Sequence, residues 1–80
     1  MKRVLKVNMP LYFGYWTGEQ GDLSSDIRKA VILEDGDDDT AMMEAYDWFE
    51  ASCEDGEEVH VVELPEERFA KMLKWANENL

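Results

Sequence analysis

The sequence predicts a small α+β domain in which two helices pack on one face of a three-stranded antiparallel or mixed sheet. Two segments, 40–53 and 65–80, repeat apolar residues at the spacing of a helix. Three others, 3–16, 26–34 and 58–64, are rich in the β-branched and aromatic residues that strands favour. The resulting order, β-β-α-β-α, fits a hairpin followed by a helical crossover and a last helix.

Residues 3–16 alternate polar and apolar positions in the two-residue period of a strand. The positions that share one face are Leu5, Val7, Met9, Leu11, Phe13 and Tyr15. Pro10 lacks an N–H, which indicates an edge position, a bulge or a break at this point. Residues 26–34 also fit a weaker helical stripe, but the Val-Ile-Leu run at 31–33 before a turn favours a strand. Residues 58–64, rich in valine, are the clearest strand.

Both helical segments place apolar residues at i, i+3, i+4, i+7 and i+11, so each has one apolar face. These residues are Met42, Ala45, Tyr46, Phe49 and Cys53 in the first, and Phe69, Met72, Leu73, Ala76 and Leu80 in the second. Pro65 is expected at the first position of the second helix, with Glu66 and Glu67 in its first turn. Trp48 and Trp75 each follow the first apolar position of their stripe by six residues. We therefore expect both tryptophans to pack at the border of the interface between the helices and one face of the sheet.

The 80 residues are expected to form one domain, residues 1–80, with a small core. A hydrophobic content of 45% is too high for a disordered acidic tail, so we expect the chain to fold. No apolar run approaches the length of a membrane span, and Lys2, Arg3 and Lys6 interrupt the segment where a secretory signal would lie. Together with the single cysteine, these features predict a cytoplasmic protein without membrane contact.

The charge distribution is the most distinctive property of the chain, whose net charge is −11. No lysine or arginine lies between Lys29 and Arg68, and residues 34–67 contain fifteen carboxylates. All eight basic residues lie outside this stretch, together with four acids. Clustered charge of one sign lowers stability while steering partners of the opposite sign. We therefore expect a basic protein surface as the partner, and no direct contact with nucleic acid, which an acidic surface repels.

Ten of these carboxylates are predicted to form one partner-binding surface along the first helix. Glu44, Asp47 and Glu50 lie three residues apart on its outward side, and the turns at both ends supply the rest. The predicted surface comprises Asp37, Asp38, Asp39, Glu44, Asp47, Glu50, Glu54, Asp55, Glu57 and Glu58. Carboxylates on a rigid helix can take the place of phosphates in a protein groove that binds DNA. Two alternatives remain: a solvated face that only confers solubility, and a halophilic origin, which the clustering and the five lysines disfavour.

Residues 11–16 form the densest aromatic segment of the chain. One interpretation places its odd-numbered members in the core and packs Tyr12 and Trp16 against the hairpin. The other exposes Tyr12 or Trp16, together with Met43 of the first helix, as the apolar centre of an interface. The outer face of the second helix carries three basic residues, Arg68, Lys71 and Lys74. They either pair with the acids of a second copy or balance local charge, so a monomer and a homodimer both remain open.

Residues suited to catalysis or metal binding do not fall into a motif. The acidic run from Asp35 fails the EF-hand pattern, because Thr40 and Tyr46 stand where glycine and glutamate are required. A helix-capping turn is the better interpretation, with weak cation binding as the alternative. His60 alternates with valines in a strand, and Cys53 lies amid carboxylates, which raise a thiol pKa. We therefore expect no enzymatic activity, no metal and no other cofactor.

With its size, its acidity and its carboxylates concentrated between Asp37 and Glu58, the chain resembles small acidic phage-encoded inhibitors of host defence. These are the anti-CRISPR proteins and the DNA-mimic antirestriction proteins. The resemblance implies non-catalytic binding to the basic nucleic-acid groove of a defence complex in the host cytoplasm, and hence evasion of host defence. The alternative is an acidic interaction module, such as an antitoxin or an adaptor, that neutralises a basic partner.

Overall fold

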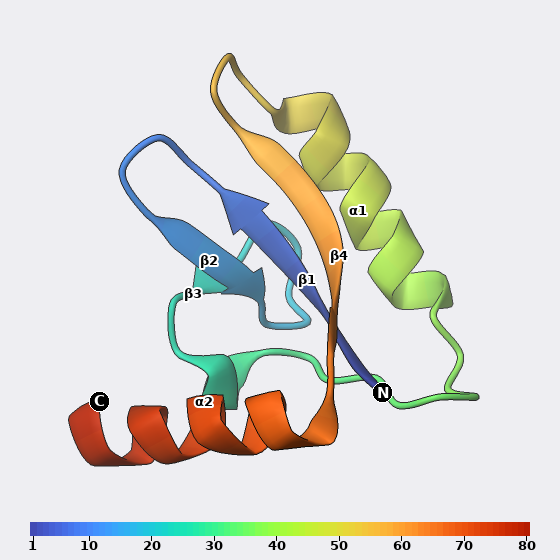
Figure 1. Cartoon of the computed structure of the whole chain (residues 1–80). Coiled ribbons are helices and arrows are strands. Elements are labelled where there is room, and N and C mark those ends of the chain that lie inside the picture. The colour runs from blue at the N-terminus through green and yellow to red at the C-terminus, as the bar shows by residue number, and fades with distance from the viewer.

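The computed structural model describes all 80 residues and shows the α+β class that the sequence predicts (Figure 1). Four strands form one antiparallel sheet in the spatial order β3-β2-β1-β4. The strands are β1 (Lys2–Asn8), β2 (Phe13–Trp16), β3 (Leu23–Ser24) and β4 (Glu58–Leu64). The helices are the short 3₁₀ helix η1 (Ile27–Lys29), α1 (Thr40–Ser52) and α2 (Glu66–Asn79). Neither α-helix is long and apolar enough to cross a membrane.

The segment 3–16, expected as one strand, forms two strands joined by a tight turn. The chain reverses at Pro10, where the N–H of Met9 donates to the carbonyl of Tyr12 over 2.8 Å. β1 and β2 then pair antiparallel, with Lys6 opposite Tyr15. Of the alternatives that proline indicates, a break is therefore correct, and it raises the number of strands above the predicted three.

The strand expected at 26–34 does not form. The Asp26 carboxylate accepts a hydrogen bond from the N–H of Arg28 at 3.0 Å and so caps η1. Such local bonds between side chain and backbone compete with a sheet ladder. Only Leu33 makes an isolated bridge, to Arg3, and the fourth strand of the sheet is β3.

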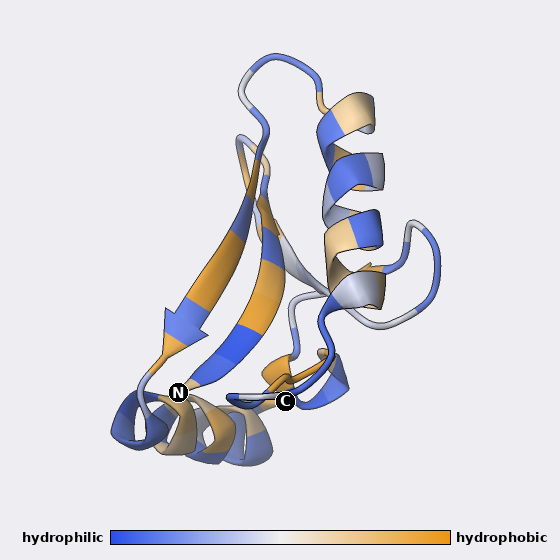
Figure 2. Ribbon diagram, turned by 90° about the vertical axis from the view of Figure 1, so that its right-hand side faces the viewer, coloured by the Kyte–Doolittle hydropathy of each residue, from blue (hydrophilic) through white to orange (hydrophobic).

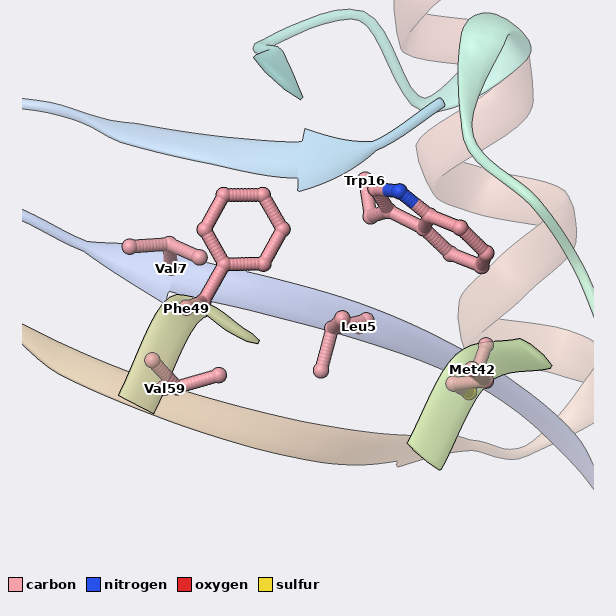
Figure 3. Close-up of a cluster of buried hydrophobic side chains, with 6 residues drawn as sticks. All are labelled: Leu5, Val7, Trp16, Met42, Phe49 and Val59. Carbon is pink, nitrogen blue, oxygen red and sulfur yellow. The ribbon is translucent and has the colours of Figure 1, made fainter. Parts of the chain in front are cut away.

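The two helices cover opposite faces of the sheet, so the prediction that both pack on one face is wrong. α1 contributes to the core cluster of Leu5, Val7, Trp16, Met42, Phe49 and Val59 (Figure 3). α2 contributes to the second cluster of Val4, Tyr15, Ile27, Leu64 and Ala76. Neighbouring residues of a strand point to opposite faces, which is why Val4 and Leu5 belong to different clusters. In Figure 2 the strands, which lie between the two helices, carry both hydrophobic and hydrophilic residues along their length.

The apolar stripe of each helix is confirmed, because its residues are buried or pack against one of the two clusters, apart from the exposed Leu80. The two tryptophans do not border one common interface: Trp48 is 41% exposed and Trp75 is 59% exposed, on helices that cover different faces. Pro65 stands at the N-cap of α2 rather than at its first helical position, with Glu66 and Glu67 in the first turn as predicted.

The structure agrees with each interpretation of the aromatic segment in part, because Trp16 is packed in the fold while Tyr12 and Met43 are exposed. Tyr15 and Trp16 are buried, so Trp16, at 7% exposure, is not a free interface residue. The turn residues Leu11 and Tyr12 are 94% and 68% exposed, and Phe13 is also exposed. The odd-numbered positions are therefore not all core, because the turn at Pro10 carries Leu11 beyond the end of the sheet.

Candidate acidic interaction surface

The ten predicted carboxylates extend along α1 and the turns at both its ends. We call this set the acidic surface: Asp37, Asp38, Asp39, Glu44, Asp47, Glu50, Glu54, Asp55, Glu57 and Glu58. Eight of the ten are exposed, while Asp39 and Glu57 are half-buried. Since α1 spans 13 residues, the helical part of the surface is about 20 Å long.

The three helical acids wind around α1 instead of forming a straight column. Glu44, Asp47 and Glu50 follow one another at an axial rise of about 4.5 Å, and a row of i±3 spacing is inclined at about 45° to the helix axis. Phosphates along one DNA strand rise by about 3.4 Å. The axial spacing is thus similar to that of phosphates, but the row passes from one flank of α1 to the other.

At the N-terminal end of α1, basic residues neutralise several acids. A guanidinium nitrogen of Arg3 lies 3.5 Å from the Asp39 carboxylate. Beside the acidic surface, Lys2 pairs with Glu34, and the terminal ammonium of Met1 lies 2.7 Å from Asp35. This end of the surface is therefore partly balanced by the N-terminal strand.

Several acids of the surface also have local structural roles. Asp38 accepts hydrogen bonds from the N–H and the hydroxyl of Thr40, at 2.9 and 2.6 Å, and these bonds lower the pKa of the Asp38 carboxyl. Asp39, the N-cap residue itself, makes no capping bond. Asp37 and Glu57 each accept a hydrogen bond, at 2.8 Å, from the backbone N–H three residues before it. The capping function expected of the run 37–39 is thus carried by Asp38.

The remaining acids of the helix and of its C-terminal turn are free of side-chain bonds. No hydrogen bond or ion pair in the structure involves the carboxylates of Glu44, Asp47, Glu50, Glu54 or Asp55. Glu58 has one partner, His60, at 3.4 Å, and that contact is ionic only when the histidine is protonated. This half of the surface is therefore uncompensated negative charge.

Three of the free acids also lie where the helix itself disfavours them. The C-terminal end of α1 carries the negative end of the helix dipole, and no basic residue stands in its last turn. Glu50 lies in that turn, and Glu54 and Asp55 follow directly after the C-cap Cys53. Burial, assisted by Glu57 and Glu50, raises the pKa of the Cys53 thiol, so this cysteine is kept in its unreactive form.

A hollow of about 370 Å³ lies between α1 and the loop that follows β2. Its walls include Glu44 and Trp48 of α1, Trp16 of β2, and Gly21 of the loop. Gly21 has a φ of +75°, and a Cβ there would meet the Trp48 ring at 3.1 Å, so glycine lets the loop approach the helix. The sequence did not indicate this hollow, because the loop and the helix are distant along the chain.

No protein-family model, curated protein or solved structure matches the chain. The resemblance to acidic inhibitors of host defence therefore rests on size, charge and the placement of the acids.

No three His, Cys, Asp or Glu side chains gather in a way that could hold a metal ion. That the protein is not an enzyme stays a prediction.

Proposed function

We propose that this protein is a non-catalytic inhibitor that binds a basic, nucleic-acid-binding surface of a defence complex, such as CRISPR effector machinery. The acidic surface would occupy the positions that phosphates take in the groove. The observation that carries the proposal is the set of free carboxylates on α1 and its C-terminal turn. They lower stability, three of them at the unfavourable end of a dipole, and no contact within the fold compensates for them.

An interface also requires apolar area, since charge chiefly sets the rate and specificity of association. Met43, 41% exposed, precedes Asp47 by four residues and Glu50 by seven, so it lies beside both on the surface of α1. Tyr12 and Trp16 were the other predicted anchors; Tyr12 stays exposed, but at the hairpin turn. Met43 beside these acids is therefore the apolar contact that the proposal uses.

The proposal is tested by comparing two triple variants of equal net charge. Glu44→Gln, Asp47→Asn and Glu50→Gln together neutralise the free acids of α1. The control neutralises three acids outside the acidic surface that make no ion pair, Glu19, Glu67 and Glu78. Each variant serves as bait for nucleic-acid-binding complexes in a bacterial lysate at low and high salt, with duplex DNA as competitor. The α1 variant is expected to lose binding and the control to retain it, because only the first removes phosphate-like positions.

One observation favours the alternative of an adaptor or antitoxin. Apolar side chains are also exposed away from α1, where Phe13, Trp75 and Leu80 line a second hollow of about 290 Å³ on the α2 side. An interface centred there would be apolar and insensitive to the charges of α1. Binding that duplex DNA does not displace, and that persists at high salt, would support this alternative.

A further inference from the structure

β4 lies at the edge of the sheet with one side unpaired. Its only sheet neighbour is β1, with which it pairs without interruption from Lys2 opposite Leu64 to Asn8 opposite Glu58. Figure 2 shows β4 as the strand whose arrowhead ends beside α2, and no strand or helix lies along its outer side. The other edge strand, β3, has two residues, so β4 is the one long open edge.

The hydrogen bonds of β1 determine which groups of β4 face outward. The N–H and the carbonyl of Arg3 both bond to Leu33, on the side of β1 away from β4. In an antiparallel pair these groups alternate in direction along the strand, so the even-numbered residues of β1 bond to β4. Their partners are Leu64, Val62, His60 and Glu58. The outward-facing residues of β4 are consequently Val59, Val61 and Glu63, and no backbone hydrogen bond from outside the sheet reaches them.

The only charged residues at this edge are acidic, and other features by which proteins block unwanted strand pairing are absent. Exposed edges are commonly protected by lysine, by proline or by a β-bulge. β4 contains no proline, lysine or arginine, and its register with β1 has no bulge. Its charged residues are Glu58 and Glu63. The edge therefore offers three donors and three acceptors in a negative environment.

α1 extends this negative environment above the edge. The helix packs on the face of β1 and β4, and its flank with Glu44 and Trp48 faces the loop after β2. Helical spacing puts Met43 and Glu50 on the opposite flank, toward the outer side of β4, and Asp47 between the two flanks. A strand added beside β4 would have alternate side chains directed to the flank with Met43 and Glu50.

We propose that the open edge of β4 binds an extended segment of the partner, rich in lysine and arginine, as a fifth strand of the sheet. This rests on the proposed function, because it specifies how the basic partner is held. Backbone bonds to Val59, Val61 and Glu63 supply the affinity, as in other cases of strand addition. Basic side chains of the segment meet Glu63 and, on the α1 flank, Glu50. A second copy of this protein is disfavoured as occupant, because each copy carries a net charge of −11.

A defined probe tests the edge independently of any natural partner. The probe is a seven-residue peptide of alternating lysine and valine with blocked ends, and the control alternates lysine with proline, so its charge is equal but it cannot form a ladder. Amide hydrogen exchange of the full chain is the measurement. Without peptide, the amides of Val59, Val61 and Glu63 are expected to exchange fast, and those of His60, Val62 and Leu64 slowly. The lysine-valine probe should slow the first three, and the lysine-proline control should not.

A matched pair of variants at one position separates backbone bonding from charge. Glu63→Pro removes an outward N–H that makes no bond within the fold, and proline is tolerated in edge strands at such positions. Glu63→Gln removes the same charge and keeps the N–H. The proline variant should bind the lysine-valine probe roughly tenfold more weakly than the glutamine variant. Slow exchange of the His60 and Val62 amides in both variants shows that the sheet is intact.

The outcomes separate this inference from the proposed function. Equal probe affinity of the two variants, or equal protection by the lysine-proline peptide, overturns strand addition. If lysate binding requires the acids of α1 but is the same for both Glu63 variants, strand addition is wrong while the proposed function stands. If binding depends on the N–H of Glu63 and not on those acids, the proposed function fails and the edge site stands. Protection of Val59 and Val61 that rises with protein concentration without peptide assigns the edge to a second copy and overturns the proposal.

Discussion

Neutralising Glu50 should stabilise the protein, although the substitution removes a charge and adds no contact. Glu50 is exposed, makes no ion pair and lies in the last turn of α1, at the negative end of the helix dipole. Glutamine has a similar helix propensity, so Glu50→Gln changes the charge and little else. The matched control is Glu67→Gln, which removes an exposed, unpaired carboxylate from the first turn of α2, at the positive end of that dipole.

The size of the effect follows from the position of the charge. A charge at a helix end contributes about 0.3–1 kcal/mol, and the exposure of Glu50 places it at the lower end, about 0.3–0.5 kcal/mol. In a domain of 60–100 residues, 1 kcal/mol shifts Tm by about 4–8 °C. Glu50→Gln should therefore raise Tm by roughly 1–4 °C, and Glu67→Gln should lower it by a similar amount.

Differential scanning calorimetry at low ionic strength measures both shifts. At about 1 M salt the Debye length falls to about 3 Å, so both shifts should shrink. If the two variants gain stability equally, general repulsion within a protein of net charge −11 explains the effect. That result would show that the acids at the end of α1 are not specifically unfavourable to folding.

Three further predictions concern the fold. Leu5→Ala should reduce the free energy of unfolding by about 2–5 kcal/mol in urea titrations, because Leu5 is fully buried between α1 and the sheet. Gly14→Ala should reduce it by about 1–3 kcal/mol in the same assay, because a Cβ at that position would lie 2.7 Å from the Cβ of Leu23 and displace β3. The hydrogen bonds of Arg28 lower the pKa of Asp26 from 3.8 to about 2, so the stability they contribute is complete above pH 4 and lost as pH falls toward 2. Asp26→Asn should remove that part of the pH dependence of unfolding, and NMR titration of the Asp26 carboxyl should give a pKa of about 2.

The elements that the sequence predicted best are those whose pattern is local. The stripe from Met42 to Cys53 determined both the extent of α1 and its buried face, because a helix satisfies its backbone bonds within itself. The strand 58–64 was equally clear from its β-branched residues, and β4 has these bounds.

The elements predicted wrongly depend on contacts between distant segments. Ile27 and the residues after it fit a strand, but the Asp26 cap and the packing of Ile27 in the α2 cluster favour a 3₁₀ turn. The sequence pattern also did not determine which face of the sheet each of the helices α1 and α2 covers. β4 carries apolar residues on both faces, with Val59 toward α1 and Leu64 toward α2, so either arrangement would bury apolar area.

For the candidate site, the sequence predicted which acids lie along α1 but not their surroundings. The pairing of Asp39 with Arg3 joins residues far apart in the chain, so it could not be read from the charge pattern. The open edge of β4 could not be predicted from the sequence either. The residue pattern of a strand does not indicate whether one or two other strands pair with it.

We proposed that the free acids of α1 bind a surface that otherwise holds nucleic acid. The most direct test of this proposal is the capture of nucleic-acid-binding complexes from a bacterial lysate by the wild-type protein and by the two triple variants of equal charge, with duplex DNA added in increasing amounts. We predict that DNA displaces the wild-type protein and the Glu19/Glu67/Glu78 control alike, and that the Glu44/Asp47/Glu50 variant captures nothing. Equal capture by both triple variants, or complexes that DNA does not displace, would contradict this proposal.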